Sequence, residues 1–248
     1  MLSLFKRKPK SLTDLSWLGV DIHSHLLPGI DDGSVDLEHS ILYIKRLKLL
    51  GFHSLFCTPH ILKELYPNTQ ESINYALDLV STELRRQEIH IQIGAAAEYM
   101  IDDGFEISNQ LLCLPGKFLL IEMSYLAESP NIEKVIFNLQ ILGYHIILAH
   151  PERYNFYHQN LARYERLKDI GCLFQLNLLS VTGYYGKEVK KAAEYLVKNK
   201  LYDLAGTDLH HDKHLNVLEK SVKSGDMYRA IGNYPFKNKK IFSADDTN

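Results

Sequence analysis

The chain has few cysteines, and they do not form a disulfide pattern. Only Cys57, Cys113 and Cys172 occur in 248 residues, far apart and without a CxxC pair. An odd, widely spaced set excludes a disulfide-stapled scaffold and points to a reducing compartment, so a cytoplasmic location is expected. A metal site in this chain would therefore use nitrogen and oxygen ligands, which the 12 histidines can supply in part.

The chain also lacks a long apolar run and an excess of positive charge. No stretch reaches the ~18 apolar residues of a membrane span, and the basic residues near the amino terminus are not followed by a signal-peptide core. A net charge of −2 argues against nucleic acid as a partner. Residues 1–16 are predicted to be a flexible basic tail with at most weak or indirect membrane contact, and residues 243–248 a C-terminal tail.

Between the tails, residues 17–242 alternate short apolar runs with segments of helical periodicity. The runs are nearly continuous in aliphatic residues, as in parallel strands buried on both faces. They span residues 18–22, 54–58, 90–94, 118–123, 145–149, 173–177 and 202–206. We interpret these as seven strand-then-helix units without a long linker. Because no glycine-rich phosphate loop follows the first run, the pattern predicts an α/β barrel of about seven strands rather than an open doubly wound sheet.

The intervening segments carry helix signals. Ser34 is predicted to cap a helix that runs to about residue 50, with acidic residues in its first turn and Gly51 as its stop. Further helices are predicted over residues 71–86, 131–142, 161–170, 187–197 and 215–223.

Polar side chains follow the ends of these strands. His23 and His25 are two residues apart, so both point the same way from an extended strand, and Asp208 and His210 repeat this spacing. The carboxyl ends of barrel strands share the face that carries active sites, so these residues are expected to converge. The other strand-end candidates are Asp31, Asp32, His60, Glu98, Glu122, His150, Glu152 and Arg153. Mixed histidine and carboxylate ligands suit Mn, Fe or Zn better than Ca.

Each candidate alone has an ordinary alternative, because an isolated HxH pair or carboxylate is common. His145 is expected to be structural at the opposite barrel end, and His158, His211 and His214 to lie near the site without a role. The adjacent tyrosines at 184–185 are candidates for lining a substrate groove. The chain contains neither a GxSxG nucleophile elbow nor a P-loop.

Seven motifs in order carry a family resemblance over residues 17–242. They are HSHLLPGIDDGS at 23–34, TPH at 58–60, AAEY at 96–99, IEMS at 121–124, AHPERY at 149–154, SVTGYYGK at 180–187 and GTDLHH at 206–211. Together they resemble the PHP (polymerase and histidinol phosphatase) superfamily. Within it they are most similar to the bacterial manganese-dependent protein-tyrosine phosphatases of capsule and exopolysaccharide operons, the CpsB/YwqE type.

The resemblance implies a PHP domain at 17–242, a distorted (β/α)7 barrel similar to a TIM barrel, with three divalent metal ions. The implied first metal is bound by His23, His25, Glu98 and Asp208. The second is bound by Glu98 as a bridge, Glu122 and His150. The third is bound by Asp32, His60 and His210. Arg153 is the implied phosphate-binding catalytic residue. The choice of Asp32 over Asp31, and of His210 over His211, rests on motif alignment.

The resemblance further implies hydrolysis of phosphotyrosine without a cysteine nucleophile, with Mn as the expected metal and Fe or Zn as alternatives. The implied partner is a phosphotyrosine protein, the tyrosine-rich tail of an autokinase that controls capsular or exopolysaccharide synthesis. One alternative is a small-molecule phosphatase acting on histidinol phosphate. Another is a non-catalytic regulatory scaffold that holds metal. The sequence does not indicate an oligomeric state.

Overall fold

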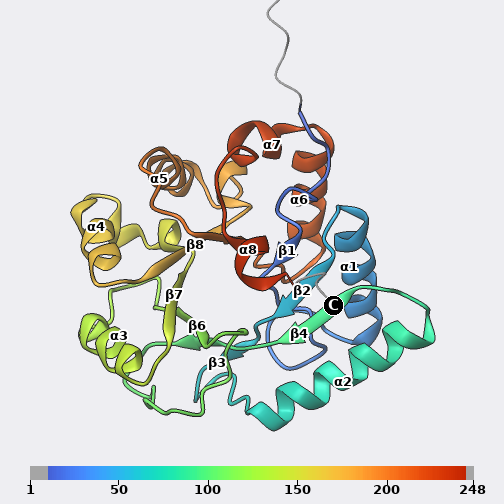
Figure 1. Ribbon diagram of the computed structural model, residues 1–248, viewed down its shortest axis with the longest axis horizontal. Helices are drawn as coiled ribbons and strands as arrows, with labels where there is room; N and C mark the ends of the chain where they lie inside the picture. Colours follow the sequence, from blue (N-terminus) through green and yellow to red (C-terminus); the bar gives the residue numbers. More distant parts are fainter. Residues whose placement is uncertain (1–10, 244–248) are drawn as a thin grey trace, which may run out of the picture.

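The computed structural model describes residues 11–243, which form an α/β fold of parallel strands surrounded by helices (Figure 1). One sheet has the order β1-β2-β4 and the other the order β3-β5-β6-β7-β8-β9. The first contains β1 (Val20–Asp21), β2 (Ser54–Cys57) and β4 (Gln92–Ala95). The second contains β3 (His60–Ile61), β5 (Glu98–Met100), β6 (Phe118–Glu122), β7 (His145–Ala149), β8 (Leu173–Asn177) and β9 (Leu204–Gly206).

The two sheets are parts of one ring of seven strand segments. β2 and β3 belong to one interrupted segment, and so do β4 and β5, because both sheets keep the same register. Between β9 and β1 the described residues form no ladder, and the two ends of the ring meet only at a single parallel bridge, Ser24 to Leu209. Next to it, the N–H of Asp208 donates to the carbonyl of His23 at 2.7 Å. The predicted α/β class and seven-segment parallel arrangement are confirmed. The interrupted strands and the single bridge between β9 and β1 are the features by which the ring departs from a regular barrel.

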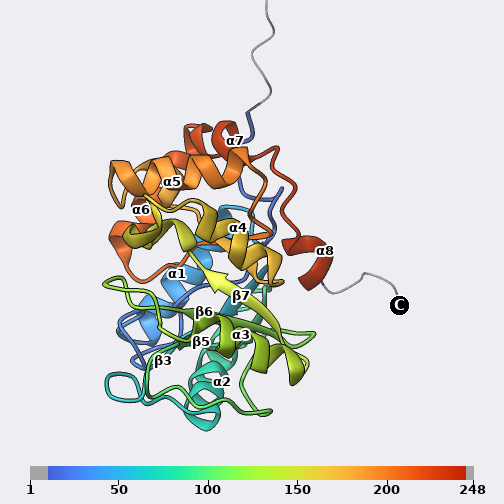
Figure 2. The same cartoon turned by 90° about the vertical axis from the view of Figure 1, so that its left-hand side faces the viewer.

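At the amino end of the ring, a short helix replaces the missing ladder between β1 and β9. α8 (Asn238–Phe242) places the Asn238 amide between the strands. Its Nδ2 donates to the carbonyls of Val20 at 2.9 Å and Ala205 at 2.7 Å, and its Oδ1 accepts from the N–H of Ala205 at 3.0 Å. Phe242 packs into the buried interior cluster of the ring with Phe56. Figure 2 shows α8 on the side from which β7 starts, opposite its arrowhead.

The remaining helices pack around the strands. They are α1 (Leu37–Leu49), α2 (Gln70–Arg86), α3 (Ile132–Ile141), α4 (Ala162–Asp169), α5 (Lys187–Lys198), α6 (Asp212–Lys223) and α7 (Asp226–Ile231). Short 3-10 helices are η1 (Pro151–Arg153), η2 (Asn155–Tyr157) and η3 (Ser180–Thr182). Apolar faces of the helices pack on the outer faces of the strands, which gives a second and larger core. α1 to α6 correspond to the six predicted helices, whereas α7 and α8 were not predicted.

Three details of the prediction are wrong. The cap of α1 is Asp36, whose side chain accepts from the N–H of His39, while Ser34 is buried. The third unit has no helix, because residues 101–117 cross from β5 to β6 as a long loop. The tail boundary at residue 16 is too late, because Leu15 is fully buried and its N–H donates to the carbonyl of Leu50. Residues 1–10 and 244–248 lie outside the described part of the chain.

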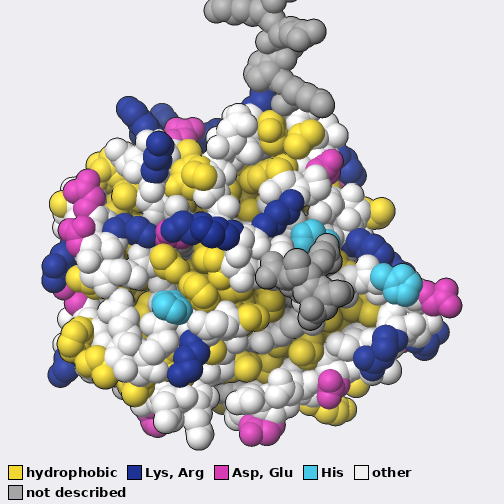
Figure 3. All heavy atoms as spheres, in the orientation of Figure 1, with side chains coloured by type: hydrophobic (Ala, Val, Ile, Leu, Met, Phe, Trp, Pro, Cys, Tyr) yellow, Lys and Arg dark blue, Asp and Glu magenta, His cyan; other side chains and the backbone are white. Residues whose placement is uncertain are grey.

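Within residues 11–243, none of the helices combines the length and apolar character that crossing a membrane requires. On the face seen in Figure 3, basic and acidic side chains are interspersed over most of the surface.

Candidate metal centre

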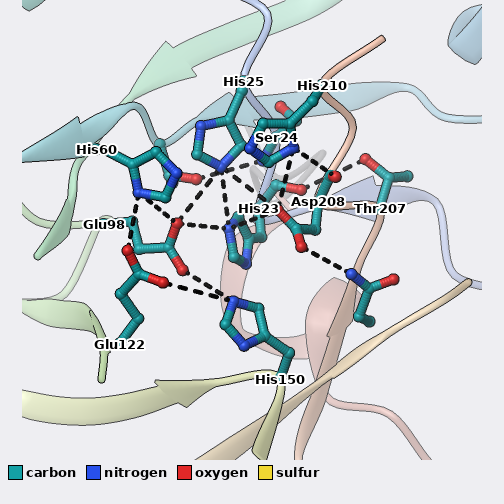
Figure 4. A network of polar contacts seen from close by, with 12 residues as sticks. His23, Ser24, His25, His60, Glu98, Glu122, His150, Thr207, Asp208 and His210 are labelled. Carbon is teal, nitrogen blue, oxygen red and sulfur yellow. Dashed lines mark hydrogen bonds and ion pairs between the residues drawn. The ribbon is translucent and has the colours of Figure 1, made fainter. Parts of the chain in front are cut away.

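Eight histidine and carboxylate side chains from different strand ends turn toward a common centre (Figure 4). All come from the carboxyl ends of the strand segments, which lie on one face of a parallel barrel. His23 and His25 follow β1, His60 begins β3, Glu98 begins β5, Glu122 ends β6, His150 follows β7, and Asp208 and His210 follow β9. Residues as far apart in sequence as His23 and Asp208 are thus brought into contact, as the sequence pattern predicts.

The first cluster consists of four buried side chains, His23, His25, Glu98 and Asp208. His23 Nε2 lies 3.2 Å from Glu98 Oε2 and 3.4 Å from Asp208 Oδ1. His25 Nε2 lies 3.4 Å from each of the same oxygens and 3.3 Å from His23 Nε2. Two imidazole nitrogens and two carboxylate oxygens therefore face one point, a ligand set suited to a transition-metal dication.

The second cluster lies nearer to solvent and contains His25, Asp32, His60 and His210. Asp32 Oδ1 lies 3.4 Å from both His60 Nε2 and His210 Nε2. The Asp32 side chain is 52% exposed, whereas those of His60 and His210 are 15% and 13% exposed. This cluster is the predicted third set with His25 added. Because Asp32 is exposed, a cation bound here would be accessible from solvent.

The third cluster contains His60, Glu98 and Glu122, with His150 beside it. His60 Nδ1 lies 2.9 Å from Glu122 Oε1 and 3.2 Å from Glu98 Oε2. His150 Nε2 lies 3.2 Å from Glu98 Oε1 and 4.0 Å from Glu122 Oε2. Glu98 is shared with the first cluster, which places it between the two groups of side chains. The residues differ from the predicted second set by the closeness of His60.

The environment of Glu98 indicates that the donor set fits divalent cations. Glu98 Oε2 is buried and forms no hydrogen bond of ordinary geometry among the described residues. Its nearest groups are the imidazole nitrogens of His23, His25 and His60 at 3.2–3.4 Å, so a buried negative oxygen faces several nitrogen donors at a point that a cation would satisfy. Burial would raise the pKa of Glu98, but the His23 and His60 charges outweigh burial and hold it well below its usual range. Burial would lower the pKa of His60, yet Glu98 and Glu122 help raise it to about 9. Without metal, protons on the imidazoles balance the carboxylates.

Two further side chains orient the imidazoles from behind. Asp31 Oδ2 lies 2.7 Å from His25 Nδ1, and Gln175 Oε1 lies 2.9 Å from His23 Nδ1. Each acceptor fixes a proton on Nδ1 and directs Nε2 to the centre, as partners of metal-binding histidines do. Gly33 is packed so tightly on His25 that an added Cβ would lie 2.2 Å from the His25 carbonyl oxygen, so this turn requires glycine.

The geometry favours one member of each pair that motif alignment left open. Asp31 contacts the far side of His25, whereas Asp32 belongs to the second cluster. His211 is the N-cap of α6 and accepts from the N–H of His214, whereas His210 belongs to the cluster.

Arg153 lies at the edge of the clusters with its guanidinium between two aromatic rings. Its centre is 4.7 Å from the Tyr125 ring and 4.2 Å from the Tyr185 ring. Its Nη1 donates to Asp208 Oδ2 at 2.8 Å. Arg153 is the last residue of η1. The residue before η1, His150, has a left-handed backbone with φ 34°. Asp208 is also left-handed, at φ 49°, and such strain clusters at functional sites.

A cavity of about 340 Å³ opens over the clusters and Arg153. Its walls include the rings of Tyr66, Tyr125, Tyr185 and His214. Aromatic walls beside Arg153 and beside clusters able to hold cations suit a ligand with an aromatic ring and an anionic group. Of the two tyrosines predicted to line a substrate groove, Tyr185 lines this cavity. His214 also lines the cavity, although it was predicted to have no role.

Gln175, Tyr125 and Tyr66 were missed as site residues. Gln175 lies within an apolar strand pattern, where a lone amide gives little signal. Tyr125 and Tyr66 stand in loops with no distinctive spacing. Only the fold brings them to the strand ends.

The cysteines are not placed as nucleophiles. Cys57 and Cys172 are fully buried, and burial raises the pKa of each thiol to about 12. The cavity lining contains no cysteine of the described residues. Thiols in such surroundings are inert, unlike the low-pKa thiolates of cysteine phosphatases.

Curated relatives align with more than three quarters of the chain. Tyrosine-protein phosphatase YwqE of Bacillus subtilis is 29% identical over 201 residues, 79% of each chain. Tyrosine-protein phosphatase CpsB of Streptococcus agalactiae is 28% identical over 202 residues, 77% of this chain and 83% of the relative. CpsB of Streptococcus pneumoniae, also named a tyrosine-protein phosphatase, is 26% identical over 201 residues, 77% of this chain and 83% of the relative.

Solved structures with a similar fold cover most of the chain as well. A chain from the crystal structures of YwqE from Bacillus subtilis and CpsB from Streptococcus pneumoniae, described as unique metal-dependent tyrosine phosphatases, matches with a TM-score of 0.74 and 28% identity. The match covers 90% of this chain and 96% of that chain. The lactonase Lmo2620 from Listeria monocytogenes matches with a TM-score of 0.53 over 92% of each chain, at 14% identity, which shows a shared fold alone.

The family model described as capsular polysaccharide synthesis, CpsB/CapC, matches residues 19–223. The resemblance predicted from the motifs is confirmed, and the chain belongs to the CpsB/CapC family of capsular polysaccharide synthesis.

Proposed function

We propose that the protein is a metal-dependent protein-tyrosine phosphatase. The observation that carries the proposal is the meeting of three His/carboxylate clusters with Arg153 under an aromatic-walled cavity. The relatives at 26–29% identity are named tyrosine-protein phosphatases, which supports the same reaction here. The folded domain is proposed to span residues 17–242 together with the packed segment that contains Leu15.

Three divalent cations are the proposed cofactors, with Mn as the first choice and Fe or Zn as alternatives. The proposed ligands are His23, His25, Asp32, His60, Glu98, Glu122, His150, Asp208 and His210. When bound, such cations supply Lewis acidity and lower the pKa of a coordinated water, so that a hydroxide is available near neutral pH.

The protein side chains then position the substrate. Arg153 is proposed to bind two phosphate oxygens at once, because a guanidinium forms paired hydrogen bonds that an ammonium cannot. The Tyr125 and Tyr185 rings pack against the guanidinium and leave the side chain 20% exposed. Tyr66 offers a further ring at the cavity wall for the phenyl group of the substrate.

The leaving group needs little help from an acid. A tyrosine phenol has a pKa near ~10, so the departing phenolate is far more stable than an alkoxide. Hydrolysis of an aryl phosphate therefore depends little on a general acid, whereas hydrolysis of an alkyl phosphate gains more from one. Histidinol phosphate is an alkyl phosphate, which makes the small-molecule alternative the weaker one.

The physiological substrate is proposed to be a phosphotyrosine protein, the tyrosine-rich tail of an autokinase acting in polysaccharide synthesis. The family to which the chain belongs supports this partner. Comparison of kcat/KM for a phosphotyrosyl peptide and for histidinol phosphate tests the substrate class. A higher value for histidinol phosphate would contradict the proposal.

The reaction itself is tested by metal removal and by substitution. Treatment with a chelator should abolish hydrolysis of a phosphotyrosyl peptide, and added Mn should restore it. His23→Ala/Asp208→Ala should be inactive with Mn, while the exposed control His90→Ala should keep full activity. Full activity of the double variant would overturn the proposal.

Arg153→Ala distinguishes the enzyme from a regulatory scaffold that holds metal. An enzyme should lose activity roughly 10²–10³-fold while it keeps its fold and metal content. A scaffold would keep its effect on polysaccharide production in cells carrying this variant.

A further inference from the structure

A second, larger groove lies outside the metal-site cavity. It has a volume of about 760 Å³ and runs between η3, α5, α6 and α7. Its charged lining residues are Lys190, Lys220, Asp226 and Arg229. Neither the clusters nor Arg153 belongs to it.

The groove is positively charged although the whole chain carries a net charge of −2. Lys190 and Lys220 form no salt bridge with any residue in 11–243. Arg229 is paired with Asp226, whose pKa is lowered mainly by Ser224 and Arg229. One carboxylate thus faces three cationic side chains, which leaves a net charge of +2 on the lining residues. On the face seen in Figure 3, Lys and Arg side chains stand over α5, at the upper left.

The groove adjoins the metal-site cavity through two neighbouring tyrosines. Tyr184 lines the groove, and its ring meets the Tyr185 ring edge-on at 5.0 Å. Tyr185 lines the cavity and contacts Arg153. Tyr184 also meets the ring of His214, another cavity residue, at 5.1 Å. A polypeptide leaving the cavity past these rings would enter the groove.

We propose that this groove binds an acidic stretch of the polypeptide whose phosphotyrosine lies in the metal-site cavity. The inference rests on the proposed phosphatase function and extends it to the sequence around the phosphotyrosine. Charge complementarity identifies the occupant, because carboxylates or further phosphates compensate Lys190 and Lys220. The groove then contributes to substrate affinity and leaves the chemical step unchanged.

The test compares two phosphotyrosyl peptides that differ only in flanking charge. One carries four glutamates beside the phosphotyrosine and the other four glutamines, with both flanks tried. The Mn-loaded wild type should show a kcat/KM for the acidic peptide roughly fivefold higher, through KM, and the preference should shrink with salt. Lys190→Glu/Lys220→Glu should remove the preference. Turnover of p-nitrophenyl phosphate should not change.

The matched control reverses two exposed lysines elsewhere, Lys134→Glu on α3 and Lys240→Glu on α8. It should retain the acidic preference. The inference is overturned if the wild type shows no preference for the acidic peptide. It is also overturned if the groove variant keeps the preference, or if the control variant loses it to the same extent. A groove variant that loses binding to phosphatidylserine vesicles but keeps its peptide preference overturns it too, because the surface would then bind membrane.

A binding measurement separates this inference from the proposed function. Versions of both peptides with a non-hydrolysable phosphonate are titrated against the Mn-loaded protein. If neither phosphopeptide is hydrolysed, the proposed function fails. A several-fold lower Kd for the acidic phosphonate, lost in the groove variant, would still support the groove, and equal Kd values would overturn it.

Discussion

Gln175 joins two strand ends through one amide. Its Oε1 accepts the N–H of His150 at 3.2 Å as well as facing His23 Nδ1 at 2.9 Å. Its Nε2 donates to the carbonyl of Leu176, so the orientation of the amide is determined. A single buried residue therefore orients the imidazole of His23 and holds the backbone of His150, two proposed metal ligands.

Gln175→Leu should weaken metal binding rather than abolish the reaction. The variant keeps the volume but leaves His23 Nδ1 without an acceptor, and loss of such a partner typically lowers metal affinity roughly 10–100-fold. We expect a matching rise in the Mn concentration needed for half-maximal activity, measured by Mn titration, with kcat recovered at saturation. The exposed control Gln159→Leu should titrate like the wild type. An unchanged Mn midpoint in Gln175→Leu would show that His23 is held by other contacts.

At the scale of elements, α8 takes the place of ladder hydrogen bonds. Asn238 is fully buried and bonds the backbones of β1 and β9, where the two strands do not pair directly. Helix and ring closure are therefore one cooperative unit.

Asn238→Ala should lower the free energy of unfolding by about 3 kcal/mol, because buried backbone groups at Val20 and Ala205 lose their partners. Urea titration of the metal-free protein measures this change. Lys240→Ala, on the exposed side of the same helix, is the control. Equal stability of Asn238→Ala and wild type would mean that β1 and β9 are joined without the helix.

Asp203 joins three other elements outside the site. It accepts from Lys237 Nζ at 2.7 Å, from the N–H of Phe174 at 3.0 Å and from Lys168 Nζ. Burial would raise the pKa of Asp203, but Lys168 and Lys237 outweigh burial and lower it. A carboxyl whose pKa is lower in the folded protein stabilises it above the pKa of the unfolded chain. That stability is lost as the pH falls through the folded pKa.

Asp203→Asn should therefore be less stable than wild type by about 2 kcal/mol at pH 7, and the gap should narrow below about pH 4. Urea titrations of the chelator-treated proteins at several pH values measure the gap. Asp103→Asn, an exposed position, should show no gap. A gap independent of pH would indicate lost packing instead of lost charge.

At the scale of the whole molecule, we expect the stability of the fold to depend on metal binding at the clusters. The buried carboxylates of Glu98 and Asp208 keep lowered pKa values only while cationic groups lie beside them. Without metal, the imidazoles provide that charge by holding protons.

Metal binding should therefore release protons, and metal should stabilise the fold more as the pH rises. The pKa of His60 is raised to about 9 in the metal-free protein, so this imidazole is protonated at pH 7 and must lose a proton to bind. We expect the Tm increase given by a fixed Mn concentration to grow from pH 6.5 and to level off above about pH 9. At pH 7, Mn at 100-fold its Kd should add about 2.7 kcal/mol.

Differential scanning fluorimetry with and without Mn measures this series, and calorimetry in two buffers counts the protons. His23→Ala/Asp208→Ala should show a much smaller increase at every pH. A Tm increase that is flat over this range would contradict proton-coupled binding.

Local patterns in the sequence were sufficient for the strand and helix order and for the candidate ligands. Buried strands are apolar whatever they pair with, and polar residues that follow them, such as His23 and Asp208, stand out from that background. Patterns failed where the signal was short or shared. α8 is five residues long, and Asp36 competes with Ser34 as a cap. The seven-unit pattern also implied a helix after the third strand, although no helical periodicity marked residues 101–117.

What the sequence alone determined was the family and the seven strand segments, and through the family resemblance it supplied nine candidate metal ligands. Only the tertiary structure separated Asp31 from Asp32, brought Gln175 behind His23 across 152 positions, and placed Arg153 between two rings. It also placed Asn238 between strands more than 30 positions away and opened a basic groove beside Tyr184. The reason is physical: periodicity reports burial within one segment, whereas orientation and charge balance depend on contacts between distant segments.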